Sequence, residues 1–193
     1  MAVLKALTYN LGNLLTFTGR ETRGQFWPYA AIVFVFSMAG MMAVMMPEMF
    51  ASMERMQKFA TEHPELATIQ QGSGSYSITV QGNHPELMPD MANMMGMMAI
   101  VFIFAISLLA AAVARRLHDR GKSGAWGLMP LPFITFASVM MPTVFAQTFA
   151  DMGLFFTMFI NNVLYIAALV FLVILLAGAG SEGENRFGPD PTL

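Results

Sequence analysis

The sequence predicts an all-α integral membrane protein with four transmembrane helices and both termini in the cytoplasm. Three observations support this prediction. Only 11% of the 193 residues are charged, against about 25% in ordinary soluble domains, while 56% are hydrophobic. Four long stretches contain no charge at all. The cations, finally, gather before the first stretch and between the second and the third.

The four uncharged stretches comprise residues 24–47, 91–114, 123–150 and 152–181. Each is longer than the roughly 20 residues that cross about 30 Å of hydrocarbon at about 1.5 Å per residue. We therefore expect a single membrane domain over residues 1–193. Its spans are expected at about 26–46, 93–113, 125–146 and 155–177, with an outer loop at 47–90 and a cytoplasmic tail at 180–193.

Residues 1–19 carry leucines at near-helical spacing, at positions 4, 7, 11, 14 and 15. This spacing is typical of a short amphipathic helix that lies on the inner membrane surface. An ordinary helix packed against the protein would show the same pattern, so both interpretations stay open.

The outer loop is acidic, and we expect it to be mobile. Its first part, residues 47–60, keeps the apolar spacing of a helix, which indicates that the first helix continues beyond the bilayer. The alternation of Tyr76, Ile78 and Val80 predicts one short β-hairpin. The tetrapeptide HPEL occurs at 63–66 and again at 84–87, which is weak evidence for a repeat.

The third and fourth stretches contain helix-breaking and polar residues. Pro130, Pro132 and Pro142 predict a kinked or partly irregular third span. Asn161 and Asn162 are expected to donate hydrogen bonds to another helix, each worth about 1 kcal/mol. No ionisable side chain lies deep in any expected span, which disfavours a proton-coupled transporter.

Loop charges set the expected orientation. The segment before the first span has three cations against Glu21, and the loop between the second and third spans has four cations against Asp119. The outer loop, in contrast, has two cations against six acids. Both termini are therefore expected in the cytoplasm, and Trp27 and Trp126 stand where an aromatic belt at the cytoplasmic boundary would lie.

Three short segments flank the spans: FTGRETRGQFW at 17–27, ARRLHDRGKSGAWGL at 114–128 and NRFGPDP at 185–191. In this order, with hydrophobic spans between them, they resemble a bacterial inner-membrane family catalogued as domain of unknown function 805. The chain departs from the family at Ala125, where a bulky aromatic residue is common, and in its longer, methionine-rich outer loop. The resemblance implies this architecture and a place in the bacterial cytoplasmic (inner) membrane, but no activity.

By the expected orientation, the three segments share the cytoplasmic face, where we expect them to form one polar cap. The candidate site residues are Arg20, Arg23, Arg115, Arg116, His118, Asp119, Arg120, Lys122, Asn185 and Arg186.

Three interpretations of these residues stay open. In the first, topology alone explains the cations, as charges at a helix end that face headgroups. They can instead bind an anionic group, above all a lipid headgroup, because arginine binds phosphate bidentately and basic segments attract acidic lipid. In the third interpretation they are neutralised internally by Asp119 and by the tail acids at 182, 184 and 190.

We expect a non-catalytic protein whose partners are the lipid bilayer and its anionic phospholipids, with no cofactor, metal or nucleic acid. A membrane or cytoplasmic protein partner and a homo-oligomer stay open. A membrane enzyme that uses His118 as a general base is a weaker alternative, because His118 and Asp119 are helix neighbours that point about 100° apart.

A second alternative is copper sensing or transport. Methionine thioethers select soft Cu(I), although methionine is also a common apolar packing residue. The alternative rests on two rows of methionines at helical spacing. One row occupies positions 38, 42, 45, 49, 53 and 56, and the other occupies positions 88, 91, 94, 95 and 98.

Overall fold

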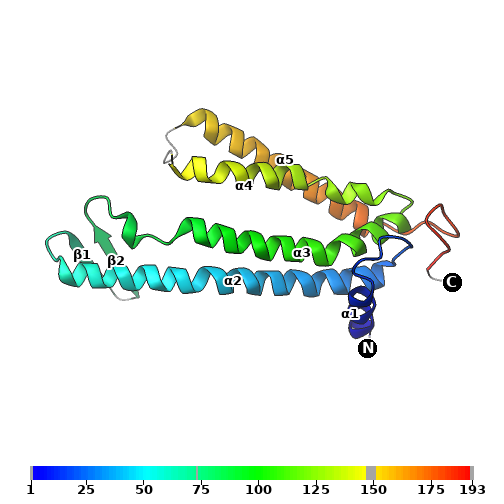
Figure 1. Ribbon diagram of the computed structural model, residues 1–193, viewed down its shortest axis with the longest axis horizontal. Coiled ribbons are helices and arrows are strands. Elements are labelled where there is room, and N and C mark those ends of the chain that lie inside the picture. The colour runs from blue at the N-terminus through cyan, green and yellow to red at the C-terminus, as the bar shows by residue number, and fades with distance from the viewer. Residues whose placement is uncertain (1, 73, 147–150, 192–193) are drawn as a thin grey trace. The chain divides into compact units, whose positions relative to one another are not determined.

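The computed structural model describes residues 2–72, 74–146 and 151–191. Within these residues, four helical segments are long and apolar enough to cross a membrane: Arg23–Glu62, Pro85–Asp119, Gly124–Val144 and Met152–Ala177. The predicted class, an all-α protein with four transmembrane helices, is confirmed. In chain order, the elements are α1 (Ala2–Gly12), α2 (Arg23–Glu62), β1 (Ala67–Gly72), β2 (Ser75–Val80), η1 (Pro85–Leu87), α3 (Met91–Asp119), η2 (Gly124–Leu128), α4 (Leu131–Ala146) and α5 (Met152–Ala177) (Figure 1).

The chain forms two compact units. The first comprises residues 1–35 and 104–193, and so contains α1, the beginning of α2, the end of α3, and the helices α4 and α5. The second comprises residues 36–103, with the rest of α2, the β-hairpin and the beginning of α3.

The buried core of the first unit lies where α2 begins and where α3 and α5 end. Here the hydroxyl of Tyr29 donates a hydrogen bond of 2.9 Å to the carbonyl of Leu108, which satisfies the polar end of a fully buried ring. The core cluster comprises Phe26, Tyr29, Val33, Ala112, Leu117 and Leu176.

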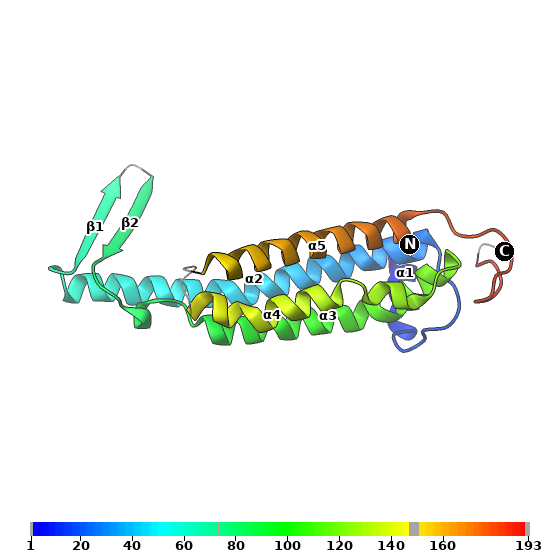
Figure 2. The same cartoon turned by 90° about the horizontal axis from the view of Figure 1, so that it is seen from above.

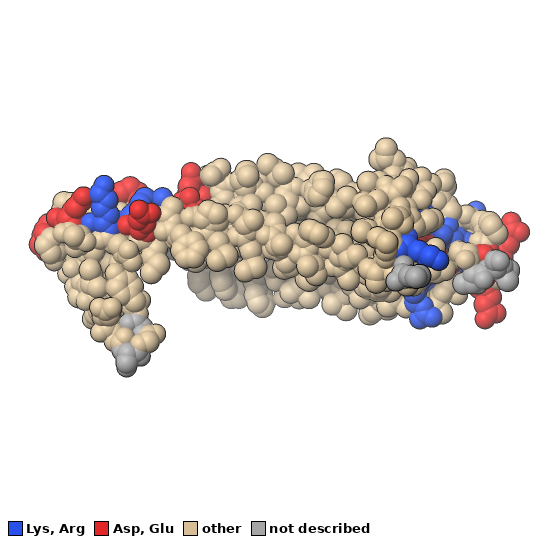
Figure 3. Space-filling view, turned by 90° about the horizontal axis from the view of Figure 1, so that it is seen from below, with Lys and Arg blue, Asp and Glu red and all other residues tan. Residues whose placement is uncertain are grey.

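Elsewhere in this unit, large apolar side chains face outward. On α5, Ile166, Val170 and Ile174 are 52%, 53% and 61% exposed. In Figure 3, the charged atoms of this unit gather at the end that carries α1 and the C-terminal tail, while the helical surface beside them is uncharged. An outer surface of this kind suits a lipid solvent, in which exposed leucine or isoleucine has no cost.

α4 and α5 lie side by side (Figure 1). The side chain of Asn161 donates a hydrogen bond of 3.1 Å to the carbonyl of Phe133, so the predicted interhelical hydrogen bond is confirmed for this residue. Asn162 is exposed and forms no such bond within the described part of the chain. The predicted third span is interrupted between η2 and α4 at Pro130, which lacks an N–H donor, and Pro142 lies inside α4.

In the second unit, regular structure occupies most of the predicted outer loop. α2 continues to Glu62, as the spacing of residues 47–60 indicates. The predicted hairpin is confirmed: β1 and β2 pair antiparallel, with Ala67 opposite Val80 and Gly72 opposite Ser75.

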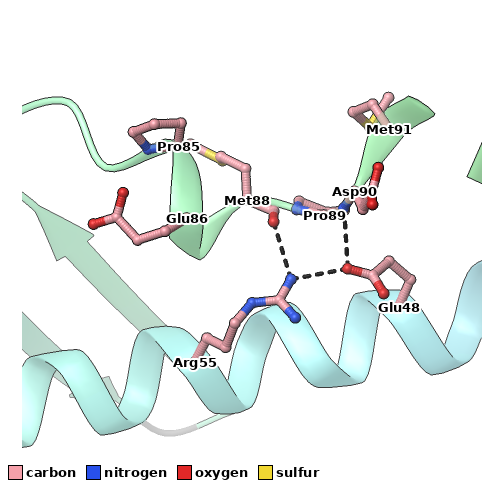
Figure 4. A pocket seen from close by; sticks show the side chains of 8 residues that line it. All are labelled: Glu48, Arg55, Pro85, Glu86, Met88, Pro89, Asp90 and Met91. Atoms are coloured by element: carbon pink, nitrogen blue, oxygen red, sulfur yellow. Dashed lines mark hydrogen bonds and ion pairs between the residues drawn. The ribbon is translucent and has the colours of Figure 1, made fainter. Parts of the chain in front are cut away.

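The segment after the hairpin is held to α2 by polar contacts (Figure 4). Arg55 donates hydrogen bonds to Glu48 at 2.9 Å and to the carbonyl of Met88 at 3.0 Å. Glu48 also accepts the backbone N–H of Asp90 at 3.0 Å. An open pocket of about 580 Å³ lies at this place, lined by Glu48, Arg55, Pro85, Glu86, Met88, Pro89, Asp90 and Met91.

The two HPEL copies have related surroundings. His63 and His84 both lie against Phe59, with ring centroids 4.7 and 4.5 Å from its centroid. The Nδ1 atom of each histidine approaches the glutamate of its own copy, at 3.4 Å for Glu65 and 2.9 Å for Glu86. The repeat therefore places two histidine–glutamate pairs around one aromatic ring at the end of α2.

The hydrogen bond between α4 and α5 leads to a first prediction. Replacing Asn161 with leucine should lower the free energy of unfolding by about 0.6 kcal/mol, the average for interhelical hydrogen bonds in membrane proteins. The same change at the neighbouring Asn162 should have a smaller effect. Unfolding of the purified protein by sodium dodecyl sulfate in mixed micelles measures both, and equal losses would contradict the assignment.

Candidate functional site

α3 ends in a glycine cap at the centre of the candidate site. Gly121 has a φ of 65°, a left-handed conformation that favours glycine. Its N–H donates to the carbonyl of His118 at 2.9 Å, and the N–H of Lys122 donates to the carbonyl of Leu117 at 2.9 Å. This pair of bonds is a Schellman motif, and it turns the chain sharply after the last helical turn.

Arg116 lies in that last turn and Arg115 just before it, and both are buried, with 0% and 1% exposure. Neighbouring side chains on a helix point about 100° apart. The two guanidinium groups therefore reach different segments of the chain. Arg115 binds the N-terminal segment, and Arg116 binds the C-terminal end of α5.

The N-terminal cluster surrounds the guanidinium of Arg115. Its Nε donates to Glu21 at 3.0 Å, and its Nη2 lies 2.9 Å from the same carboxylate and 2.6 Å from Asn10. Its Nη1 donates to the carbonyls of Asn13 and Thr16 at 2.9 and 2.6 Å. Each of the five guanidinium N–H groups thus has an acceptor.

Glu21 is the acid of this cluster, and it is fully buried. Its carboxylate also accepts the amide of Asn10 at 2.8 Å. Burial raises the pKa of the Glu21 carboxyl above its ordinary value, while the hydrogen bond from Asn10 and the charge of Arg115 act in the opposite direction. The ionised form of Glu21 therefore depends on Arg115.

The C-terminal cluster surrounds Asp119. Arg20 donates to one carboxylate oxygen of Asp119 from Nε and Nη2, at 3.2 and 3.1 Å, and Arg116 pairs with the other. Arg116 also donates to the carbonyls of Leu176, at 2.9 Å, and Gly178. These bonds tie the end of α5 to the end of α3.

The C-terminal tail wraps around the same cluster. Arg20 donates to the carbonyls of Ser181 and Gly183 at 2.6 and 2.5 Å. The N–H of Ser181 donates to the carbonyl of Asp119 at 2.8 Å. Gly180 is required here, because a Cβ at this position would overlap the Asp119 carboxylate.

The NRFG segment of the tail covers His118. The side chain of Asn185 donates to the carbonyl of His118 at 3.1 Å. The ring of Phe187 stacks on the imidazole with centroids 3.9 Å apart and planes 6° from parallel, and Arg186 lies 4.6 Å above the Phe187 ring. The Nδ1 atom of His118 is 3.2 Å from the carbonyl of Gly19, so it is the nitrogen that donates.

The ten sequence-predicted residues therefore fall into two groups. Arg20, Arg115, Arg116, His118, Asp119 and Asn185 form the interior, together with Asn10 and Glu21, and we call these eight residues the cap network. Arg23, Lys122 and Arg186 are exposed, and Arg120 is half-buried against Gly178. We call these four the rim.

Sequence reasoning missed Asn10 and Glu21 as members of the site. Glu21 lies between the two arginines of the first motif, Arg20 and Arg23. A single acid between two cations was the sequence feature that could have indicated an ion pair. The third interpretation expected the tail acids to neutralise the arginines, but two of the three do not pair with any cation among the described residues. Glu182 and Glu184 are exposed and form no ion pair within the described residues, while Asp190 accepts the N–H of Gly183 at 3.1 Å.

The geometry bears on the two alternative functions. Asp119 directs both carboxylate oxygens to arginines, so it does not orient His118 as a catalytic dyad would require. In the described part of the chain, no three histidine, aspartate or glutamate side chains are grouped as a metal site. Met42, Met49 and Met53 are exposed on α2, and their binding of copper stays a prediction.

Four apolar helical segments and a buried polar cluster at one end of the first unit define an all-α, multi-pass membrane protein. The chain belongs to the family described as protein of unknown function DUF805, which matches residues 14–189. The predicted resemblance is confirmed, and the match contains the arginines and carboxylates of both clusters but neither α1 nor Asn13. Comparisons with curated proteins and with solved structures give no match.

The buried pair of Arg115 and Glu21 leads to a second prediction. Removing one partner leaves a buried charge uncompensated, so Arg115→Met or Glu21→Gln should lower the free energy of unfolding by about 3–5 kcal/mol. The double variant should lose less than the sum of the two single losses, because neither charge then remains. Lys122→Met, at an exposed position, should change stability by about 0.5 kcal/mol or less. Additive losses in the double variant would show that the pair is not coupled.

Proposed function

We propose that this protein is a non-catalytic component of the bacterial cytoplasmic membrane that binds anionic lipid headgroups at its rim. In this proposal both termini and the cap network lie in the cytoplasm. The rim consists of Arg23, Arg120, Lys122 and Arg186, as defined above. The observation that carries the proposal is that these four cations have no carboxylate partner among the described residues.

The contrast between the rim and the cap network supports the assignment of ligand binding to the rim. Arg20, Arg115 and Arg116 are almost completely buried. Internal acceptors bind all five N–H groups of the first two and four of the five in Arg116, so they have little capacity left for a ligand. The network has three arginines against two carboxylates, Glu21 and Asp119, and so retains one positive charge. Its charge and the four rim cations together attract an anion.

The position of the rim favours a lipid headgroup as that anion. Arg23 is the first residue of α2, and Lys122 and Arg120 lie in the turn between α3 and η2. These are the ends of candidate membrane helices, where headgroups are the nearest anions. Trp27 and Trp126, which are 37% and 44% exposed, lie beside these residues as an interfacial aromatic belt would.

The charge distribution also supports the proposed orientation. Short loops rich in lysine and arginine stay in the cytoplasm. The rim and the cap network carry seven of the ten cations of the chain, whereas the predicted outer loop carries two cations and six acids. A cytoplasmic rim would face the inner leaflet, where anionic lipid attracts basic segments next to a membrane span.

Headgroup binding is tested in nanodiscs that contain phosphatidylglycerol in phosphatidylcholine. Each rim charge should contribute about 1 kcal/mol, which is about 5-fold in affinity. The measured quantity is the affinity of the protein for phosphatidylglycerol. We expect this affinity to fall in Arg23→Gln and in Lys122→Gln, and to fall further in the double variant. Lys58→Gln, with the same change of charge in the predicted outer loop, is the matched control.

If the wild type shows no preference for phosphatidylglycerol, headgroup binding is wrong. An acidic protein that is retained by the wild type and lost with the rim variants would assign the rim to a protein partner instead.

The orientation is tested by cysteine labelling, which is clean because the chain contains no cysteine. Single cysteines at Lys122, Glu182 and Gln70 are treated with a membrane-impermeant maleimide. We expect Gln70→Cys to react in intact spheroplasts, and Lys122→Cys and Glu182→Cys only after lysis. Labelling of positions 122 and 182 from opposite sides would end the proposal.

A further inference from the structure

α1 runs across the direction of the membrane helices in the first unit (Figures 1 and 2). A helix in this direction, at the end of several spans, lies parallel to the membrane plane. We infer that α1 is an interfacial anchor, which buries the leucines at positions 4, 11 and 15 in the boundary between headgroups and acyl chains. This inference does not depend on the charge of the lipid, so it can stand or fall independently of headgroup binding at the rim.

One face of α1 packs on the protein. Ala6 and Asn10 are 2% and 1% exposed, and Asn10 belongs to the cap network. Leu7 packs against the core cluster that contains Phe26 and Tyr29. The helix is therefore fixed in place by both polar and apolar contacts.

The contact of Leu7 also sets the depth of α1. Phe26 and Tyr29 flank Trp27 in the first turns of α2, where an interfacial aromatic residue is expected. α1 thus lies at the level of the aromatic belt, where the apolar part of the bilayer begins. A helix that lay farther out in the cytoplasm could not reach this cluster.

The face of α1 next to the packed one is apolar and uncovered. Leu4 and Leu11 are 65% and 47% exposed, and Leu15, just after the helix, is 89% exposed. At about 25 cal/mol per Å² of apolar surface, a row of exposed leucines is unfavourable in water and favourable in lipid.

The remaining polar groups of α1 fit this placement. The hydroxyl of Thr8 donates to the carbonyl of Leu4 at 3.0 Å, so it needs no water. The side chain of Asn13 likewise donates to the carbonyl of Tyr9 at 2.8 Å. Lys5 is exposed, and its long apolar stem lets the ammonium group reach the headgroups while the helix lies below them.

A lipid surface is the occupant that these observations favour over a second copy of the chain. The depth of the helix, its direction and the uncharged helical surface beside it all belong to a boundary with lipid. A second copy would need to cover leucines that already lie at the level of the membrane.

The test uses spin labels on single cysteines at positions 4, 11 and 15, in nanodiscs of phosphatidylcholine alone. Val170→Cys on α5 serves as the lipid reference, and Glu182→Cys in the tail as the aqueous reference. The measurement is the accessibility of each label to oxygen, which concentrates in lipid, and to a water-soluble nickel complex. We expect the labels at positions 4, 11 and 15 to show the oxygen-dominated ratio of position 170 and to be less accessible to nickel than position 182.

Two results would overturn the inference. If the three labels are as accessible to nickel as position 182, α1 faces water. If they are inaccessible to both reagents, protein covers this face. The same ratios are expected in the Arg23→Gln, Lys122→Gln background, so a failure of headgroup binding at the rim leaves this result unchanged.

Discussion

The first unit depends on one constraint: two consecutive buried arginines must be compensated at the end of a helix that enters an apolar environment. An unpaired charge in such a place costs several kcal/mol. Because helix geometry sends Arg115 and Arg116 in different directions, one acid is not enough. Glu21, from the N-terminal segment, compensates the first, and Asp119, on α3 itself, compensates the second. Arg116 binds the end of α5 through the carbonyls of Leu176 and Gly178. The N-terminal segment and the end of α5 are held to α3 by this requirement.

The same constraint separates structure from binding. The arginines most prominent in the sequence, within ARRLHD, are the ones whose hydrogen-bonding capacity is used inside the protein. Within the three motifs, the exposed cations are Arg23, Lys122 and Arg186. A basic motif therefore does not identify a binding surface by itself, because a buried arginine and an exposed one have opposite roles.

Much of this architecture could be predicted from the sequence, because lipid places simple demands on a chain. Long uncharged stretches gave the four helical segments, and alternation at Tyr76, Ile78 and Val80 gave the hairpin. The prolines of the third stretch predicted an irregular span, and the break at Pro130 confirms it. The roles of Asn10 and Glu21 were harder. They depend on which side chains meet in three dimensions, and Asn10 lies in a leucine-rich segment where nothing marks it as a partner of Arg115. The pairing of Asp119 with two arginines, rather than with His118, could likewise not be read from adjacency.

The order of the cap contacts along the chain has a consequence for biosynthesis. Every ion pair of the network joins residues within the first 119 positions, so the charges can neutralise one another before α4 and α5 have been made. The carbonyls of Leu176, Gly178, Ser181 and Gly183 arrive last. The ion pairs can thus form early in synthesis. The tail adds its carbonyl acceptors only when the ribosome has finished the chain. A product truncated before the end of α5 would keep these ion pairs, but the guanidinium donors that bind the four late carbonyls would lack those acceptors.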